Sequence, residues 1–236
     1  MPWNGAGLTW LGHATFRVRT PEGRSLLIDP WTFGNPACPE DQKDAGAVDL
    51  VLVTHGHRDH IEDLGRIAAE HRPVVVTVPE LGKWVAARGV RNVFSMNAGG
   101  IVEMLEVRIT MTPAVHSSSV DDDPFAYVGL AVGYVLELSN SLRIYHAGDT
   151  AAFEGMRIIR EAYRPDVALL PIGDHHTMGP LEAALATRLL GVDRVIPMHY
   201  GLPGTPGTPA ALRTALHQLG LDHVELIEMQ PGQTLS

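Results

Sequence analysis

The sequence has a single cysteine, no run of basic residues and no long apolar segment. One cysteine, Cys38, excludes an internal disulfide framework and fits a reducing cytosol. No stretch approaches the roughly 20 apolar residues that a membrane-spanning helix needs. The N-terminus also lacks the basic and apolar regions of a secretory signal peptide. We therefore expect a cytoplasmic protein without a membrane span.

Charge and composition favour a globular protein with a large core and argue against a nucleic-acid-binding protein. The net charge is −9, and the 18 lysines and arginines are scattered, so we expect no nucleic-acid partner. With 45% hydrophobic and 19% charged residues, the chain can bury a large core. We predict one domain spanning residues 1–236 that acts on a small-molecule substrate. The oligomeric state stays open, and a homo-oligomer is compatible with the sequence.

Strand-like and helix-like patterns alternate along the chain in two comparable halves. Segments with strand character are residues 8–19, 25–28, 48–53, 74–78, 102–111, 127–138, 143–145, 167–171, 194–196 and 224–229. Segments with helix character are residues 62–70, 80–88, 153–163, 180–190 and 209–219. Residues 112–124, rich in serine and aspartate, indicate a loop. The pattern indicates a mixed α/β protein with loops at the ends of its strands.

The most informative segment is Thr54-His55-Gly56-His57-Arg58-Asp59-His60, which directly follows an apolar strand-like run. Chance placement of 12 histidines in 236 residues makes such a cluster rare, so a metal site is favoured over surface histidines in a turn. In an extended segment His55 and His57 project to the same side, while Asp59 and His60 can turn toward a second point. Imidazole and carboxylate ligands suit zinc, manganese, iron or nickel better than calcium or magnesium.

This segment resembles the signature of the metallo-β-lactamase superfamily, and three further parts of that signature follow in order. They are Pro113-Ala114-Val115-His116, His146-Ala147-Gly148-Asp149-Thr150 and Ile196-Pro197-Met198-His199-Tyr200. The resemblance implies a four-layer αββα sandwich of two mixed sheets with outer helices. It also implies two divalent ions, zinc foremost, with manganese, iron or nickel as alternatives. The implied ligands are His55, His57 and His116 for one ion, Asp59, His60 and His199 for the other, and Asp149 for both.

Other segments resemble one branch of the superfamily, the uncharacterised metal-dependent hydrolases similar to L-ascorbate-6-phosphate lactonase. A more distant similarity is to the N-acyl-phosphatidylethanolamine phospholipase D. The segments are residues 10–16 (WLGHATF), 27–31 (LIDPW) and 170–180 (LPIGDHHTMGP). The branch usually carries Asn-Phe where this chain has His175-His176, near the expected substrate pocket.

Three residues outside the ligand set are candidates for supporting roles. Asp29 resembles an early aspartate that supports the metal loop by hydrogen bonds, with a turn-initiating aspartate as the alternative. His13, which we place in a strand, is either a core histidine or a residue that supports the ligands or lines the pocket. His176 either contacts substrate or lies in an exposed loop.

The resemblance implies a hydrolase in which a hydroxide bridged by two divalent ions attacks a small ester, such as a lactone or phosphorylated sugar lactone. Asp59 is then a candidate catalytic residue that shuttles a proton, or acts only as a ligand. Two alternatives stay open. One is a phosphodiesterase acting on a small phosphodiester, a phospholipid or RNA, and the other is a catalytically silent, metal-stabilised binding protein.

Overall fold

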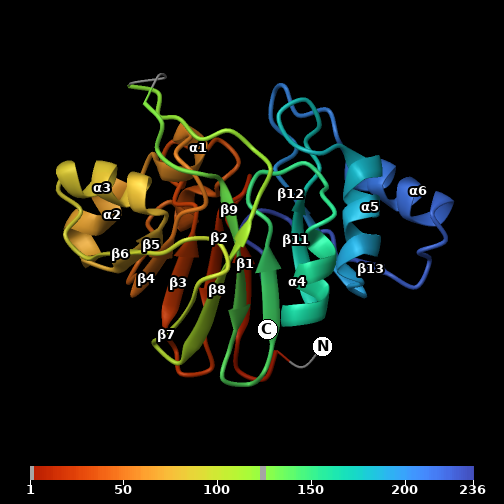
Figure 1. Cartoon of the computed structure of the whole chain (residues 1–236), viewed down its shortest axis with the longest axis horizontal. Helices are drawn as coiled ribbons and strands as arrows, with labels where there is room; N and C mark the ends of the chain where they lie inside the picture. Colours follow the sequence, from red (N-terminus) through yellow and green to blue (C-terminus); the bar gives the residue numbers. More distant parts are fainter. Residues whose placement is uncertain (1–2, 123–125) are drawn as a thin grey trace.

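The computed structural model describes residues 3–122 and 126–236 and contains two β-sheets that face each other, with helices on both outer sides (Figure 1). Each sheet has seven strands. The first half of the chain forms most of one sheet and the second half forms the other, with the C-terminal strand returning to the first sheet. The expected four-layer sandwich of two mixed sheets is confirmed.

The first sheet is antiparallel at one side and parallel at the other. Its strands, in spatial order, are β14 (Thr234–Leu235), β1 (Gly7–Trp10), β2 (Phe16–Arg19), β3 (Ser25–Ile28), β4 (Leu50–Leu52), β5 (Val74–Thr77) and β6 (Val93–Ser95). The pairs from β14 to β3 are antiparallel, and those from β3 to β6 are parallel. Strand β4, which leads into the histidine-rich segment, is fully buried in the parallel part.

The second sheet repeats this mixed arrangement. Its strands, in spatial order, are β13 (Glu225–Leu226), β12 (Arg194–Met198), β11 (Val167–Pro171), β10 (Arg143–His146), β9 (Val132–Glu137), β8 (Val107–Pro113) and β7 (Ile101–Met104). Strands β10 to β13 pair in parallel, whereas β7 to β10 pair antiparallel. Strands β8, β10 and β12 therefore run in the same direction, and their carboxyl ends lie at one edge of the sheet.

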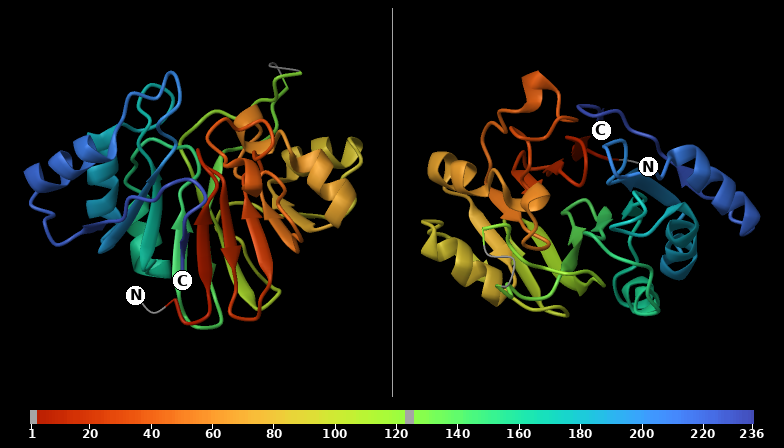
Figure 2. Two further views of the ribbon diagram at one scale, coloured as in Figure 1. Left: turned by 180° about the vertical axis from the view of Figure 1, so that it is seen from behind. Right: turned by 90° about the horizontal axis from the view of Figure 1, so that it is seen from above.

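Helices cover the outer face of each sheet, as the view from above in Figure 2 shows. The helices are α1 (Arg58–Ile61), α2 (Leu64–His71) and α3 (Pro79–Ala87) beside the first sheet, and α4 (Met156–Tyr163), α5 (Pro180–Leu190) and α6 (Pro209–Gln218) beside the second. A short 3₁₀ helix spans Glu40–Gln42. Three of the helices begin with proline, whose fixed φ suits the first helical position and whose missing N–H has no partner to lose there.

Two apolar clusters hold the layers together. One fills the space between the sheets and extends to α2 and α3, and the other lies between the second sheet and its helices. Tyr134 of β9 is fully buried, and its hydroxyl donates to the carbonyl oxygens of Val53 at 2.8 Å and Val76 at 3.2 Å. This side chain ties the second sheet to the first immediately before the histidine-rich segment.

The expected elements differ from the structure mainly at turns and at element ends. The segment 8–19 is two strands, because the chain turns at residues 11–15. His13 therefore lies in a turn, with φ of 55°, and its placement in a strand is wrong. The segment 102–111 also divides, because Leu105 and Glu106, with φ of 53° and 59°, form a tight turn between β7 and β8.

Several expected boundaries are shortened or moved. The strand expected at 127–138 begins at Val132, and the one expected at 224–229 covers only β13. The helix expected at 153–163 begins at Met156. Asp59 and His60 lie in the separate short helix α1 ahead of the expected helix 62–70, and strands β6 and β14 were not expected. The loop expected at 112–124 extends beyond the described residues, since residues 123–125 lie outside them. In the described ranges, no helix is both long and apolar enough to cross a membrane.

Candidate metal centre

Loops from both sheets meet at the edge of the sandwich that carries α1, the upper edge in Figure 1. His116, Asp149 and His199 follow strands β8, β10 and β12, whose carboxyl ends share that edge. His55 follows β4 of the other sheet, and His13 lies in the turn between β1 and β2. The topology therefore brings together side chains that are up to 186 positions apart in the sequence, the difference between residues 199 and 13.

Hydrogen bonds between these loops fix their relative positions. The Val115 backbone N–H donates to Thr150 Oγ1 at 3.0 Å, and the Ala151 N–H donates to the Val115 carbonyl at 3.1 Å. The backbone N–H of His199 donates to the carbonyl oxygen of His13 at 3.0 Å. The loops after β8 and β10 are thus joined to each other, and the loop after β12 is joined to the turn of the first sheet.

His55, His57 and His116 form one group of imidazoles. His57 Nδ1 lies 2.9 Å from His55 Nε2 and 3.3 Å from His116 Nε2. Ligand atoms about 2.0–2.1 Å from a tetrahedral zinc ion are roughly 3.3 Å from one another. The spacing of these nitrogen atoms therefore fits ligands of one ion. His55 is fully buried and the other two are partly exposed, so the group opens to solvent on one side.

A second group contains His13, Asp59, His60 and His199, whose ligand atoms lie within 4.8 Å of one another. Asp59 Oδ2 lies 2.8 Å from His13 Nε2, 3.8 Å from His60 Nε2 and 3.9 Å from His199 Nε2. The rings of His13 and His199 are also close, with centroids 3.8 Å apart. His13, for which the sequence left a core or a supporting role open, thus lies among the ligand-type side chains.

Asp149 lies between the two groups. Its Oδ2 atom is 3.0 Å from His199 Nε2, 3.4 Å from His60 Nε2, 3.6 Å from His116 Nε2 and 4.0 Å from His55 Nε2. The side chain is only 3% exposed. A buried carboxylate this close to imidazoles of both groups occupies the position that a ligand shared by two ions would need.

Asp29 contacts Thr54 and His60 and holds them in place beside the two groups. Its fully buried carboxylate accepts hydrogen bonds from the Thr54 backbone N–H at 2.8 Å and the Thr54 hydroxyl at 2.7 Å. His60 Nδ1 lies 2.7 Å from Asp29 Oδ2. This contact leaves His60 Nε2 directed toward Asp149, as expected when a carboxylate orients a metal-binding histidine.

The electrostatics of the site favour deprotonated ligand atoms at most positions. Burial, and then repulsion from His60, hold the pKa of His55 well below its ordinary value, which leaves a neutral imidazole. Burial alone would raise the pKa of Asp149, but its interactions with His199 and His60 outweigh that effect and hold the pKa well below the ordinary range. Burial would likewise lower the pKa of His60, but Asp149 and Asp29 outweigh it and raise that pKa well above the ordinary value.

Buried polar atoms that lack a hydrogen-bond partner indicate whether the residues of the two groups fit metal ions. Among the described residues, His60 Nε2 and Asp149 Oδ1 are buried side-chain atoms without a hydrogen-bond partner. Buried polar atoms rarely lack a partner, and coordination of an ion would satisfy both of these atoms. Nitrogen and carboxylate donors in these numbers suit zinc and neighbouring transition metals. The His and Asp clusters are therefore able to bind metal ions.

A cavity of about 660 Å³ opens over both groups. Its lining includes Trp31, Gly34, His57, Arg58, Asp59, Glu62, His116, Ser117, Asp121, Asp149, His176 and His199. His176 thus faces the cavity, whereas Asp29 and His13 are not part of its lining. Trp31, Arg58 and Glu62 were not expected in the site, although the i,i+4 spacing of the last two within and after the histidine-rich segment indicates an ion pair.

These three residues form one wall of the cavity. Glu62 Oε2 accepts from the Trp31 indole N–H at 2.5 Å, and Glu62 Oε1 accepts from Arg58 Nε at 3.0 Å. A side chain at Gly34 would collide with this wall, because an added Cβ would lie against the Glu62 carboxylate. The Trp31 contact has no signal in the sequence, because it depends on how the loop after β3 folds over α1.

Comparisons with known proteins agree with the fold. Residues 24–200 match the family model of the beta-lactamase superfamily domain. The chain is 49% identical to a UPF0173 metal-dependent hydrolase of Koribacter versatilis, with 100% of both chains covered. It is 46% identical to a UPF0173 metal-dependent hydrolase of Rubrobacter xylanophilus, over 98% of this chain and 96% of that one.

A solved structure supports the same placement. Igni18, a metallo hydrolase from the archaeon Ignicoccus hospitalis, superposes with a TM-score of 0.85 at 33% identity, covering 98% of this chain and 97% of that one. The resemblance to the metallo-β-lactamase superfamily drawn from the histidine and aspartate motifs is confirmed. The chain belongs to the UPF0173 family of metal-dependent hydrolases within that superfamily.

Proposed function

We propose that the protein holds two divalent ions, zinc in the first place and manganese, iron or nickel as alternatives, and hydrolyses a small ester. The position of Asp149 Oδ2, within 4.0 Å of imidazole nitrogens of both groups, carries this proposal. His55, His57 and His116 would hold one ion, Asp59, His60 and His199 the other, and Asp149 both. Two ions in such a site supply an activated water and polarise the oxygen of the bond that is attacked.

The roles of the side chains follow from their contacts. Asp59 Oδ2 lines the open cavity and lies 2.8 Å from His13 Nε2, so its carboxylate can accept a proton at the cavity surface. Burial would raise the pKa of Asp59, but His60 and His13 outweigh it and lower that pKa, so the carboxylate is ionised at neutral pH, as a metal ligand must be. His13 would hold Asp59 in one orientation, and Asp29 would hold His60 in one orientation.

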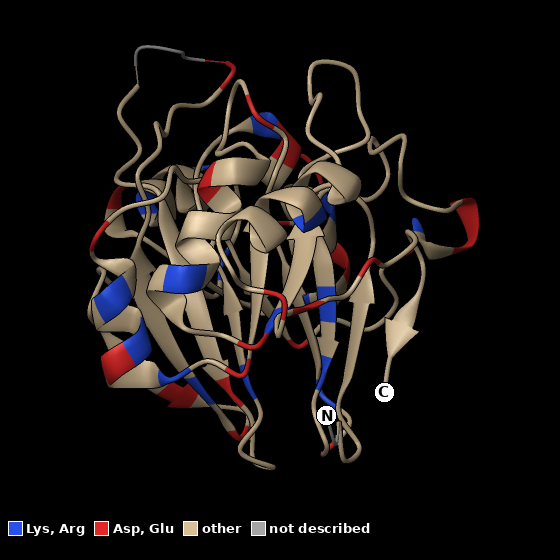
Figure 3. Cartoon of the chain, turned by 90° about the vertical axis from the view of Figure 1, so that its right-hand side faces the viewer, with Lys and Arg blue, Asp and Glu red and all other residues tan. Residues whose placement is uncertain are grey.

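The lining of the cavity favours a lactone or another neutral ester over a phosphorylated substrate. Apart from the histidines and the ions that they would hold, it contains one cationic side chain, Arg58, and that guanidinium already pairs with Glu62 at 2.5 Å. Positions of basic and acidic residues alternate along the ribbon in Figure 3, and the net charge is −9. A nucleic-acid substrate, which needs a basic surface along its phosphates, fits poorly. The resemblance of residues 10–16, 27–31 and 170–180 to the branch of L-ascorbate-6-phosphate lactonase also favours a lactone, although the lining argues against a phosphorylated one.

Two measurements test the proposal. Elemental analysis of protein reconstituted with zinc or manganese is expected to approach two ions per chain, and Asp149→Ala is expected to lose more metal than His116→Ala. A content that never exceeds one ion per chain contradicts the binuclear site.

The second measurement is hydrolysis of a panel of lactones, phosphodiesters, β-lactams and short RNA. We expect turnover of at least one lactone, and a rate reduced by about 100-fold in Asp59→Asn, because the carboxylate that holds or accepts a proton is lost. Turnover of phosphodiesters alone would move the assignment to a phosphodiesterase. No turnover by protein that contains two ions would favour a silent metal-binding protein.

A further inference from the structure

A second, largely apolar groove of about 280 Å³ lies beside the metal cavity. It is bounded by α1, α2, α3 and the segment that ends at Asp122. Its apolar lining is provided by Ile61, Leu64, Trp84, Val85, Val90 and Val120. The volume is close to the lower limit of roughly 300 Å³ for small-molecule pockets.

The groove adjoins the metal cavity. Arg58, Glu62 and Asp121 line both spaces, and Gly56, between the ligand-type residues His55 and His57, lines the groove. An added Cβ at Gly56 would lie 2.6 Å from Val128 Cγ2 and 2.8 Å from the Ser119 carbonyl, so the histidine loop packs directly against this region. The groove is therefore a neighbour of the reacting centre and not a separate surface feature.

The partition between the two spaces is a movable side chain. Arg58 is 66% exposed in its side chain and is held there by the ion pair with Glu62. Exposed ion pairs of this kind contribute little to stability, so the guanidinium can shift at low cost. Its methylene stem also offers apolar surface along which a substrate group can lie.

The far wall of the groove is fixed in advance. The guanidinium of Arg88 stacks on the Trp84 ring at 3.6 Å from its centroid and pairs with Asp122 at 2.8 Å. The stacking holds the indole of α3 in one arrangement, and the exposed Arg88–Asp122 pair adds little to it. A preformed wall lowers the entropy cost of binding an apolar group against it.

We propose that this groove binds an apolar alkyl or aryl substituent of the substrate, whose ester bond lies over the metal centre. The proposal rests on the ester hydrolase function and narrows it to esters or lactones that carry such a substituent. The two spaces on either side of Arg58 would orient the ester. Its polar part would lie in the cavity lined by the ligand-type residues, and its apolar part would lose its contact with water in the groove.

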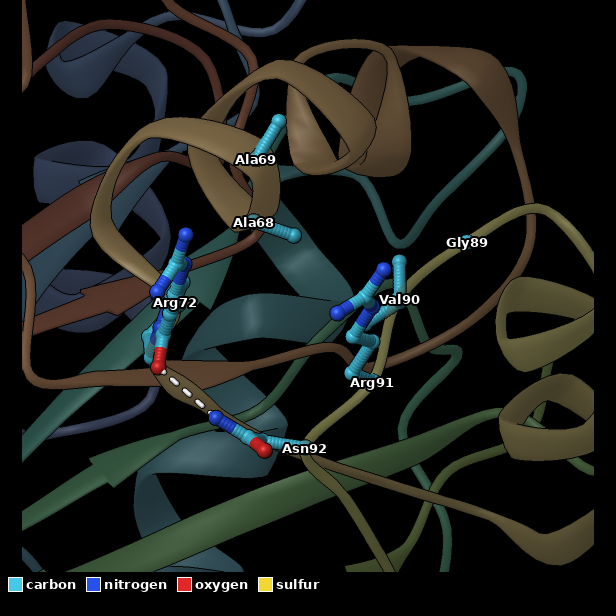
Figure 4. A pocket seen from close by; sticks show the side chains of 8 residues that line it. Ala68, Ala69, Arg72, Gly89, Val90, Arg91 and Asn92 are labelled. Carbon is cyan, nitrogen blue, oxygen red and sulfur yellow. Dashed lines mark hydrogen bonds between the residues drawn. The ribbon is translucent and has the colours of Figure 1, made fainter.

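Gly65 offers a direct way to fill the groove. It lies on α2 and lines the groove, and an added Cβ meets no atom within 4 Å. Leucine also favours the helix more than glycine does, so Gly65→Leu is expected to fold. The matched control is Ala69→Leu, on the same helix but lining the neighbouring pocket shown in Figure 4, which lies beside Arg72 and Arg91 and shares only Val90 with the groove.

The experiment compares γ-butyrolactone, γ-octalactone and γ-decalactone as substrates of the zinc-reconstituted full chain. We expect kcat/KM of the wild type to rise by up to about fourfold for each methylene that enters the groove, from roughly 0.8 kcal/mol per buried CH₂. Gly65→Leu is expected to lower the ratio of kcat/KM for the long and short lactones at least tenfold without changing the metal content. Ala69→Leu is expected to keep the wild-type ratio.

A binding measurement separates failure of this proposal from failure of the proposed function. By titration calorimetry, 4-hydroxydecanoate is expected to bind the zinc-loaded protein more tightly than 4-hydroxybutyrate, and Gly65→Leu is expected to remove the difference. That result without any lactone turnover would support the groove while rejecting lactone hydrolysis. Equal affinities in the wild type, or a chain-length preference that Gly65→Leu leaves unchanged, would overturn the groove proposal.

Discussion

Replacing Asp29 tests how the metal centre is built, because this carboxylate contacts no cavity and acts only through its neighbours. It is fully buried and receives three hydrogen bonds, two from Thr54 and one at His60 Nδ1. Asp29 itself has φ of 50°, in the left-handed region that aspartate and asparagine tolerate better than alanine. Asp29→Ala and Asp29→Asn therefore differ in both hydrogen bonding and backbone strain.

The expected losses follow from those contacts. Asp29→Ala leaves three buried donors without their acceptor, and breaking such a buried, partly charged contact costs about 3–5 kcal/mol. The left-handed backbone adds about 1 kcal/mol for alanine, so we expect the free energy of unfolding to fall by about 4–6 kcal/mol. Asp29→Asn keeps the volume, the backbone conformation and one acceptor oxygen, but its amide NH₂ faces a donor. We expect a loss of about 2–3 kcal/mol.

Urea unfolding of metal-free protein, followed by far-UV circular dichroism, measures these losses at constant m-value. Asp49→Asn is the matched control, since that carboxylate also accepts a backbone N–H, from Ser25 at 2.8 Å, but its side chain is 35% exposed. We expect its loss to stay below about 1 kcal/mol. Asp29→Asn is also expected to bind less metal, because His60 loses its fixed orientation. Wild-type stability together with wild-type metal content in Asp29→Asn would refute this account.

Three further predictions concern other parts of the molecule. Chelation is expected to lower the melting temperature, since metal at a thousand times its dissociation constant stabilises the fold by about 4 kcal/mol. The circular dichroism spectrum at room temperature should nevertheless persist, because the sheets have their own core. Complete unfolding on chelation would contradict this. His176→Phe is expected to change the ratio of rates for two lactones at constant metal content, because His176 lines the cavity, and an unchanged ratio would assign it to the exposed loop. Burial raises the pKa of Cys38 to about 11. Its thiol should therefore react with a disulfide reagent at pH 8 at least ~100-fold more slowly than a free thiol. Equal rates would show that the surroundings of Cys38 open to solvent.

The pattern of strands and helices was predictable where the chain is regular and failed where it turns. Strands β3, β4, β5 and β11 are short apolar runs bounded by polar residues, and such runs have few alternatives in a folded protein. The turn at Leu105–Glu106 lies inside a β-branched, apolar stretch without glycine, asparagine or proline. Both residues adopt a conformation that their side chains disfavour, and the pairing of β7 with β8 and the packing of Leu105 against the core stabilise it.

The site shows the same division between local and long-range information. The segment from His55 to His60 is a local signal, and the other three ligand-type residues each follow a recognisable strand. The resemblance of these segments to the metallo-β-lactamase superfamily could therefore predict which residues converge. It could not place His13 within 2.8 Å of Asp59, because that contact spans 46 positions and depends on the left-handed conformation of His13 in its turn.

The packing of the two sheets against each other explains why the Asp149 carboxylate can lie close to both groups of histidines. His55 follows a strand of the first sheet and His116 a strand of the second, so the distance between them depends on how the sheets pack. The Tyr134 hydroxyl, bonded to the Val53 carbonyl at 2.8 Å, fixes that packing two residues before His55. Asp149 follows β10, which pairs directly with the strand that carries Tyr134. The position of Asp149 between the two groups is thus set by sheet packing, which is stiff because interiors are close-packed, rather than by the loops alone.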